Sequence, residues 1–160
     1  MSSAGEGRRI PFTIKNIRGK RERSGLHHQH LTAVNAVAEI CNATVKGNEL
    51  HSHELEFIPN KIIPGRYKFD IGTAGSITLL LQSLLIPSIF AKSKIRLKIT
   101  GGSDVQWSPQ WDYLNNVIIP QLTKYAEIKT SLVRRGYYPK GGGKVDIKIK
   151  PKYNLENIKE

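Results

Sequence analysis

The chain has 160 residues, 39% of them hydrophobic and 8% aromatic, which is enough for one folded domain with its own core and excludes a disordered protein. Its 25 Lys and Arg residues outnumber 13 Asp and Glu residues, and the formal net charge of +12 favours a polyanionic partner, with nucleic acid ahead of an anionic membrane surface. A single cysteine, Cys41, excludes a disulfide framework and a cysteine-based zinc site.

The sequence carries no signal for export or for a membrane span. Residues 1–7 lack the apolar stretch of a secretory signal peptide. The longest apolar run, Ile77 to Ala91, is interrupted by Gln82 and Pro87 and is shorter than the ~20 residues that a span needs. We therefore expect a soluble, cytoplasmic protein without a membrane partner.

The first third of the chain predicts a strand, a helix and a second strand. Alternation in residues 10–15 is typical of a short, half-buried strand, and helical spacing of apolar residues over 28–42 predicts a helix. Between them lies a strongly basic loop, residues 16–24. Alternation over residues 53–57 predicts the second strand, and the two prolines within residues 58–65 indicate a boundary.

The rest of the chain predicts a complete β-α-β-α-β-β unit. Its elements are a strand at 67–71, a helix at 76–91, a strand at 95–99, a helix at 108–125, and strands at 128–134 and 144–150. The first of these helices is apolar on nearly every side, so we expect it to be buried and to kink or end at Pro87. Ser108 and Pro109 are the expected N-cap and first residue of the second helix, which we expect to kink at Pro120.

Residues 10–57 resemble the same unit with its front half missing, which indicates an incomplete internal repeat. We therefore predict a partial first repeat in residues 1–60, a complete second repeat in residues 61–151, and a tail in residues 152–160. The predicted fold class is α/β (α+β), built from repeated β-α-β-α-β-β units. A partial repeat would expose a strand edge and an apolar face, so we also expect self-association.

The stretch from Arg134 to Val145 is the least generic part of the chain. Its three glycines, Gly141–Gly143, allow positive φ angles and a close approach to a ligand or to another chain segment. Four positive charges and two aromatic rings accompany them, a mixture that suits phosphates and bases. A plain basic hairpin loop is the alternative that the local chemistry favours.

Three further features each allow a functional and a structural interpretation. The turn Gly72–Gly75 could bind a phosphate through its amides or be an ordinary link from strand to helix. Gln82, an amide within an apolar run, needs hydrogen bonds either to the neighbouring backbone or to a bound nucleotide. Asp104 follows a strand end, where active-site residues of α/β folds gather, and could equally cap a turn.

The five histidines raise the question of a metal site. They occur at positions 27, 28, 30, 51 and 53. A zinc site needs ligands that converge, and nothing in the sequence shows that these do. Solvated surface, or RNA contact from the start of the helix, is the favoured interpretation, and we assign no metal-binding residue.

Several short stretches together form a distinctive pattern. They are Ile17-Arg18 with Arg21 and Gly25-Leu26, Gln29 to Val34, Ile71 to Ser76, Leu79 to Gln82, Gly101 to Val105 with Trp107 to Pro109, and Arg135 to Gly143. In this order and at this spacing, over residues 16–150, they resemble the RNA 3′-terminal phosphate cyclase family.

The resemblance implies a fold of repeated β-α-β-α-β-β units and an ATP-dependent ligase reaction. Enzymes of this family transfer AMP from ATP to a histidine and then to an RNA 3′-phosphate. The adjacent 2′-hydroxyl, already in place, displaces AMP and leaves a 2′,3′-cyclic phosphodiester. The implied cofactors are ATP and a divalent metal, Mg²⁺ or Mn²⁺, and the implied partner is RNA with a 3′-terminal phosphate.

Several site residues are carried over by the resemblance. Gln82 matches the glutamine that contacts ATP, and polar residues grouped around the active site match Arg18, Arg21 and Gln29. Glu6 would be a remnant of the family's N-terminal Gly-Glu-Gly motif. Further candidates for the phosphate or RNA side are Asp104, Arg135, Tyr138 and Lys140.

The family continues beyond this pattern through an inserted domain and another repeat, which bears the nucleophilic histidine. The chain stops at Glu160, where that insertion would begin, and none of its five histidines matches the nucleophile. We therefore expect that it does not form the enzyme–AMP adduct alone, as a truncated product or as half of a split enzyme completed by a second polypeptide. The alternatives are a non-catalytic RNA-binding relative, like the cyclase-like proteins of RNA processing, and a general basic RNA-binding module.

Overall fold

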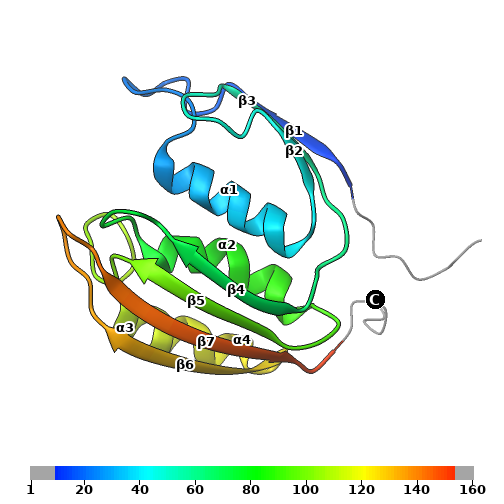
Figure 1. Cartoon of the computed structure of the whole chain (residues 1–160), viewed down its shortest axis with the longest axis vertical. Coiled ribbons are helices and arrows are strands. Elements are labelled where there is room, and N and C mark those ends of the chain that lie inside the picture. Colours follow the sequence, from blue (N-terminus) through cyan, green and yellow to red (C-terminus); the bar gives the residue numbers. More distant parts are fainter. Residues whose placement is uncertain (1–9, 154–160) are drawn as a thin grey trace, which may run out of the picture.

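Two β-sheets enclose the longer helices of the structure, a computed structural model that describes residues 10–153 (Figure 1). The chain first forms a three-stranded sheet with one helix and then a four-stranded sheet with its own helices. This mixed helix and sheet content confirms the predicted fold class. No helix in residues 10–153 is long and apolar enough to cross a membrane.

The three-stranded sheet is antiparallel, with the order β1-β3-β2. Its strands are β1 (Phe12–Lys15), β3 (Glu54–Ile58) and the short strand β2 (Thr44–Lys46), which the sequence pattern did not predict. The expectation of a half-buried first strand is wrong, because all four residues of β1 are exposed. Phe12 stacks on Phe57, with ring centroids 5.4 Å apart, and nevertheless keeps 47% of its surface exposed.

Helix α1 (His28–Ile40) lies between this sheet and the second half of the molecule (Figure 1). It buries Ala36 and Ile40 in the main core, where α1 packs against α2 (Ile77–Ile89). The predicted helix is confirmed, with its end two residues earlier than expected. Asn42 adopts a φ of 46°, which is incompatible with continuing the helix.

The second half confirms the predicted β-α-β-α-β-β order. The remaining elements are β4 (Gly65–Asp70), β5 (Ile95–Gly101), α3 (Trp111–Tyr113), the π-helix η1 (Leu114–Ile118), α4 (Ile119–Leu122), β6 (Ala126–Arg134) and β7 (Gly143–Pro151). The sheet order is β4-β5-β7-β6. Strands β4 and β5 are parallel to each other and are connected through α2, whereas β7 is antiparallel to both of its neighbours, β5 and β6.

Helix α2 forms the centre of the core, as its apolar sequence predicted. Leu80, Leu81 and Leu84 are fully buried between the sheet and α1. One narrow face remains open, where Gln82 and Ile86 are exposed. Pro87 does not end the helix, which continues for two residues to Ile89.

The second helix of the unit begins later than predicted and is irregular. Gln110, and not Ser108, is its N-cap, because the Ser108 hydroxyl instead donates to the Val105 carbonyl at 3.0 Å and closes a turn. A π-helical segment precedes Pro120, where a kink was expected. All helices of the unit lie on one face of the four-stranded sheet (Figure 1).

Candidate functional site

A cleft of about 650 Å³ opens at the carboxyl ends of the parallel strands β4 and β5. Its lining comes from α1, from the turn into α2, from the loop after β5 and from the loop between β6 and β7: Gln29, Ala74, Gly75, Ser76, Leu79, Val105, Gln106, Trp107 and Tyr138. The carboxyl ends of parallel strands are where α/β folds bind their ligands. The cleft is therefore the candidate site.

Gln29 fastens the first turn of α1 to the first turn of α2. Its Oε1 accepts from the Ser76 amide at 2.7 Å, and its Nε2 donates to the Ser76 carbonyl at 3.2 Å. Ser76 is also the N-cap of α2, since its hydroxyl accepts from the Leu79 amide at 3.2 Å. Gln29 therefore lines the cleft, but both ends of its amide are already used to hold the wall in place.

Arg135 is similarly engaged within the protein. Its guanidinium donates to both carboxylate oxygens of Asp104, at 3.2 and 3.1 Å, and to both of Asp112, at 2.9 Å each. These charge-assisted bonds, first to Asp112 and then to Asp104, raise the pKa of Arg135. The pair of candidates Asp104 and Arg135 thus joins the loop after β5, the start of α3 and the end of β6.

The glycine-rich loop between β6 and β7 packs against the turn into α2. Gly141 has a φ of 65°, and a Cβ there would lie 2.4 Å from the carbonyl oxygen of Thr73. The Arg134 guanidinium donates to the Gly142 carbonyl from Nε at 2.9 Å and from Nη2 at 2.7 Å. Of the two roles predicted for the glycine run, the structure shows the close approach to another chain segment.

Two exposed aromatic rings border the cleft. Trp107 is 95% exposed and Tyr138 is 83% exposed, and both belong to its lining. Tyr138 was predicted as a site residue, whereas Trp107 entered only as part of a sequence pattern. The sequence did contain a signal for Trp107: it lies in a loop without helical or strand periodicity, where a large ring is not expected to be part of a buried core face. Lys140 is exposed in the same loop as Tyr138 and is not part of the lining.

Gln82 lies further along α2 than the cleft. It follows Leu79, a lining residue, by three positions and therefore lies on the same side of the helix. The expected burial of its amide is wrong, because the side chain is exposed. Gln82 therefore needs no internal partner and is accessible to a ligand.

The basic loop before α1 is held together by one of its own arginines. Arg18 donates from Nη1 to the carbonyls of Arg23, at 2.7 Å, and Gly25, at 3.4 Å. Arg21 is exposed beside it. Because Gln29 follows this loop at the start of α1, the loop leads directly to the wall of the cleft.

Three of the histidines gather where this loop meets α1. The rings of His27 and His30 have centroids 6.3 Å apart, and those of His27 and His51 are 5.8 Å apart. Desolvation lowers the pKa of His30, and the positive charges of Arg18 and His27 lower it further. Within residues 10–153, no group of three or more His, Cys, Asp or Glu side chains could hold a metal ion.

Two of the sequence predictions lie outside the described residues. Glu6 falls before residue 10, and the predicted tail is described only as far as Tyr153. Within residues 10–153, the cleft therefore brings together Gln29 and Tyr138, with Gln82 one turn away. Arg18, Asp104 and Arg135 support its walls through internal hydrogen bonds.

Such an arrangement is suited to a nucleotide. Aromatic faces stack on bases, and the amino-terminal end of a helix favours phosphate groups through its dipole. The cleft offers both, because Trp107 and Tyr138 border the same space as Ser76 at the start of α2.

Comparisons with known proteins identify a family that this chain resembles over most of its length. A family model described as RNA 3′-terminal phosphate cyclase matches residues 8–159. Curated proteins named RNA 3′-terminal phosphate cyclase share 48% identity over 139 residues in Methanothermobacter thermautotrophicus and 51% over 142 residues in Pyrococcus furiosus. A third, from Hyperthermus butylicus, shares 48% over 151 residues. These matches cover 86%, 88% and 93% of the chain and 41%, 42% and 42% of the respective relatives.

Proposed function

The chain belongs to the RNA 3′-terminal phosphate cyclase family, and we propose that its cleft binds ATP and the phosphorylated 3′ end of an RNA. In the reaction that the family resemblance implies, AMP passes to the RNA 3′-phosphate and is then displaced by the neighbouring 2′-hydroxyl. A cleft that holds the nucleotide beside the RNA end would supply the proximity that this second step needs.

The observation that carries the proposal is the combination of two exposed aromatic rings with the start of α2. A base stacked on Trp107 or Tyr138 would gain about 1–3 kcal/mol. The phosphates would then face the amino-terminal end of α2 at Ser76, which carries partial positive charge. Gln82, accessible one turn further along α2, is the proposed polar contact to ATP.

Two exposed cations are available for the phosphates of RNA or ATP. Arg21 and Lys140 form no ion pair with any residue from 10 to 153, and both are exposed. Arg18 and Arg135 would instead act indirectly, by holding the loops that present these contacts. Cationic side chains near a phosphorus centre stabilise the charge that develops there.

A divalent ion would accompany the triphosphate in this proposal. The described lining of the cleft includes no carboxylate, and Asp104 is already bound by Arg135 and by the Ser103 hydroxyl. The residues present therefore do not form a site for Mg²⁺ or Mn²⁺, which commonly keeps water ligands and binds through substrate phosphates.

The histidine that accepts AMP is proposed to come from outside residues 10–153, in the same or a second polypeptide. None of the five described histidines lines the cleft. Residues 10–153 would accordingly supply binding and orientation, without the covalent step.

The test is binding and labelling of the 160-residue chain. We expect it to bind ATP and to retain no covalent label after incubation with Mg²⁺ and ATP labelled in its α-phosphate. Trp107→Ala should weaken ATP binding by roughly tenfold, in line with one lost stacking contact. Tyr113→Ala is the control, because Tyr113 is 51% exposed and lies outside the cleft.

A label held through a phosphoramidate would contradict the proposed source of the histidine. Equal losses in the two variants would contradict the cleft as the ATP site. A non-catalytic RNA-binding relative is the second candidate, because Gln29, Asp104 and Arg135 all have structural partners. That candidate predicts equal binding of 3′-phosphorylated and 3′-hydroxyl RNA, whereas the proposed function predicts preference for the 3′-phosphate.

A further inference from the structure

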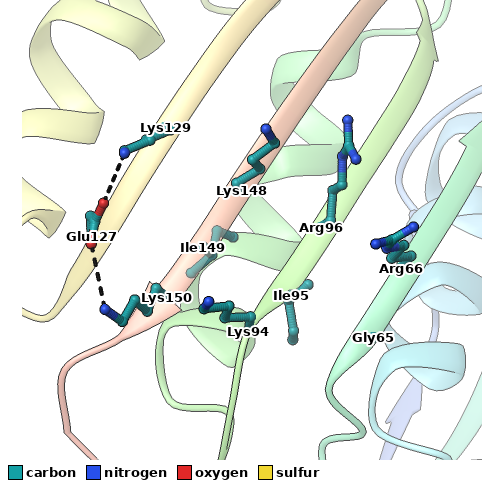
Figure 2. A pocket seen from close by; sticks show the side chains of 10 residues that line it. All are labelled: Gly65, Arg66, Lys94, Ile95, Arg96, Glu127, Lys129, Lys148, Ile149 and Lys150. Atoms are coloured by element: carbon teal, nitrogen blue, oxygen red, sulfur yellow. Dashed lines mark ion pairs between the residues drawn. The ribbon is translucent and has the colours of Figure 1, made fainter.

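The face of the four-stranded sheet that points away from its helices carries a row of four positive charges. The strand register places Arg66 opposite Arg96, Arg96 opposite Lys148, and Lys148 opposite Lys129. One cation from each of β4, β5, β7 and β6 therefore lies in a single line across the sheet. Figure 2 shows these four side chains side by side on the outer face, with the helices behind the sheet.

Further cations flank this row, and few carboxylates balance them. Lys94 and Lys150 lie on one side, around a hollow of about 610 Å³. Asp146 pairs with Arg96, and Glu127 pairs with Lys129 at 3.2 Å and with Lys150 at 3.9 Å. Three cations of the hollow, Arg66, Lys94 and Lys148, have no carboxylate of residues 10–153 within ion-pair distance.

Such a row is unfavourable for the sheet by itself. Like charges directly opposite each other on neighbouring strands are destabilising, and this sheet repeats that arrangement at three successive strand pairs. An anion that lies across the strands would offset the repulsion. The sheet alone does not require cations here, because its core is formed by the other face, through Leu97, Ile147 and their neighbours.

We propose that this outer sheet face binds the phosphate backbone of an RNA chain, as a second RNA contact separate from the cleft. The choice of RNA as the polyanion rests on the proposed function. The two surfaces share no residue. Arg66 and Arg96 lie near the amino-terminal ends of β4 and β5, whereas the cleft lies at their carboxyl ends, a strand length of roughly 15–20 Å away.

The chemistry of the face indicates contact with phosphates and not with bases. None of the ten residues that line the hollow is aromatic, so it offers no surface on which a base could stack. Its charges are mainly lysines, which contact phosphates without reading sequence. Its two apolar members, Ile95 and Ile149, are each 1% exposed and could not insert into a lipid layer, which favours RNA over a membrane surface.

The experiment measures RNA affinity against salt for the whole chain and for the triple variant Arg66→Gln, Lys94→Gln, Lys148→Gln. A 3′-hydroxyl RNA of about 20 nucleotides reports on the outer face, and a 3′-phosphorylated RNA of about four nucleotides reports on the cleft. Between roughly 50 and 200 mM salt, three lost phosphate contacts should flatten the log–log slope by about 2. Affinity for the long RNA should fall about tenfold at the middle of this range, with the short RNA unaffected.

The control variant Lys15→Gln, Lys46→Gln, Lys124→Gln removes the same charge from positions outside the hollow. The melting temperatures of both variants show whether the fold is retained. The melting temperature of the Arg66, Lys94 and Lys148 variant should not decrease, because the substitutions remove repulsion between like charges. Equal weakening by both variants, or no effect of the first, would overturn the proposal. The proposal would also be overturned if the Arg66, Lys94 and Lys148 variant lost binding to phosphatidylserine vesicles while its RNA binding was unchanged, because that result would assign the face to membranes. Failure of the short RNA and of ATP to bind, with the long-RNA result as expected, would instead reject the proposed function of the cleft.

Discussion

At the scale of single residues, Gly141 shows how the glycine-rich loop contributes to the site. Its backbone has positive φ, and its α-carbon lies so close to Thr73 that a side chain would collide with the carbonyl oxygen. Gly72 also has a positive φ, of 80°, but a Cβ there would meet no atom within 4 Å. Both glycines have a positive φ, but only Gly141 is also crowded, so substitutions at the two positions distinguish the cost of the backbone conformation from the cost of a collision.

We predict that Gly141→Ala destabilises the protein more than Gly72→Ala. The second substitution should lower the free energy of unfolding by about 1–2 kcal/mol, the usual effect of a left-handed conformation in a residue with a Cβ. The first adds a collision with backbone and should lower it by about 3 kcal/mol or more. Urea denaturation of both variants measures the difference, and equal values would show that the loop can move away from Thr73.

His30 is the residue whose charge depends on the packing of the basic loop. Its folded-state pKa lies below the ordinary value of 6.5, first through desolvation and then through Arg18 and His27. The unfolded chain therefore binds more protons than the folded protein in the window just below pH 6.5. Stability is retained above that pH and is lost as the pH falls toward the folded pKa.

We therefore predict that His30→Gln makes the protein less sensitive to acid. The decrease in melting temperature between about pH 7.5 and about pH 5.5 should be smaller in this variant than in the parent chain. The same decrease in the variant and in the parent chain would contradict a contribution of His30 to the acid response.

At the scale of secondary-structure elements, the site depends on how α1 and α2 begin. Both helices start at the wall of the cleft, and Gln29 joins their first turns through the backbone of Ser76. A second link follows from Thr78, whose hydroxyl donates to the Pro109 carbonyl at 2.7 Å and ties α2 to the loop that carries Trp107. Two glutamines on these helices therefore differ in kind, since Gln29 is used internally and Gln82 is exposed.

This difference predicts opposite phenotypes for the two glutamines. Gln29→Leu removes two hydrogen bonds and leaves the Ser76 amide without its partner, whereas the Ser76 carbonyl still accepts from the Leu80 amide, so stability should fall by about 2 kcal/mol. Gln82→Leu should leave stability within about 0.5 kcal/mol of the parent and should weaken ATP binding. Thermal unfolding and nucleotide titration of the same two proteins provide the measurements. Loss of stability in Gln82→Leu would mean that its amide has a structural partner after all.

At the scale of the whole molecule, the two sheets differ in how completely they are covered. The four-stranded sheet packs its inner face against α2 and encloses nearly the whole core cluster. The three-stranded sheet buries only Leu55 and Phe57 of β3. Its outer strands β1 and β2 have no further partner strand within residues 10–153, and Ile14 of β1 is 46% exposed.

We predict that this sheet makes the chain associate with itself at high concentration. Unpaired strand edges and exposed apolar side chains promote pairing between chains. Sedimentation velocity over a range of concentrations should show association of the parent chain, and Ile14→Lys should reduce it, because a charge on an edge strand opposes such pairing. Ile63→Lys, at a 43% exposed position in the segment between β3 and β4 and outside both sheets, is the matched control. A single monomeric species for the parent chain at all concentrations would contradict the prediction.

The local pattern of the sequence determined most of the elements. Alternation and helical spacing located both long helices and six of the seven strands in residues 10–153, because a buried face leaves a regular apolar repeat. β2 escaped detection, since three residues are too few to show a period. The start of α3 was misplaced because Ser108 has two possible partners, and only the folded loop shows that its hydroxyl bonds to Val105. Gln82 was expected to be buried because the sequence of α2 is apolar on nearly every side. Which narrow face of the helix stays open is decided only by the elements that pack around it.

The sequence by itself thus determined the family, the unit order and the identity of most polar residues near the site. The tertiary structure alone decided which of them are free to bind a ligand. Gln29, Arg18 and Arg135 have the same chemistry as ligand-binding residues, but their hydrogen bonds go to Ser76, Arg23 and a pair of aspartates, all fixed by chain folding. The row of cations on the outer sheet face likewise exists only through the register of four strands, because residues far apart in sequence become neighbours when the strands pair.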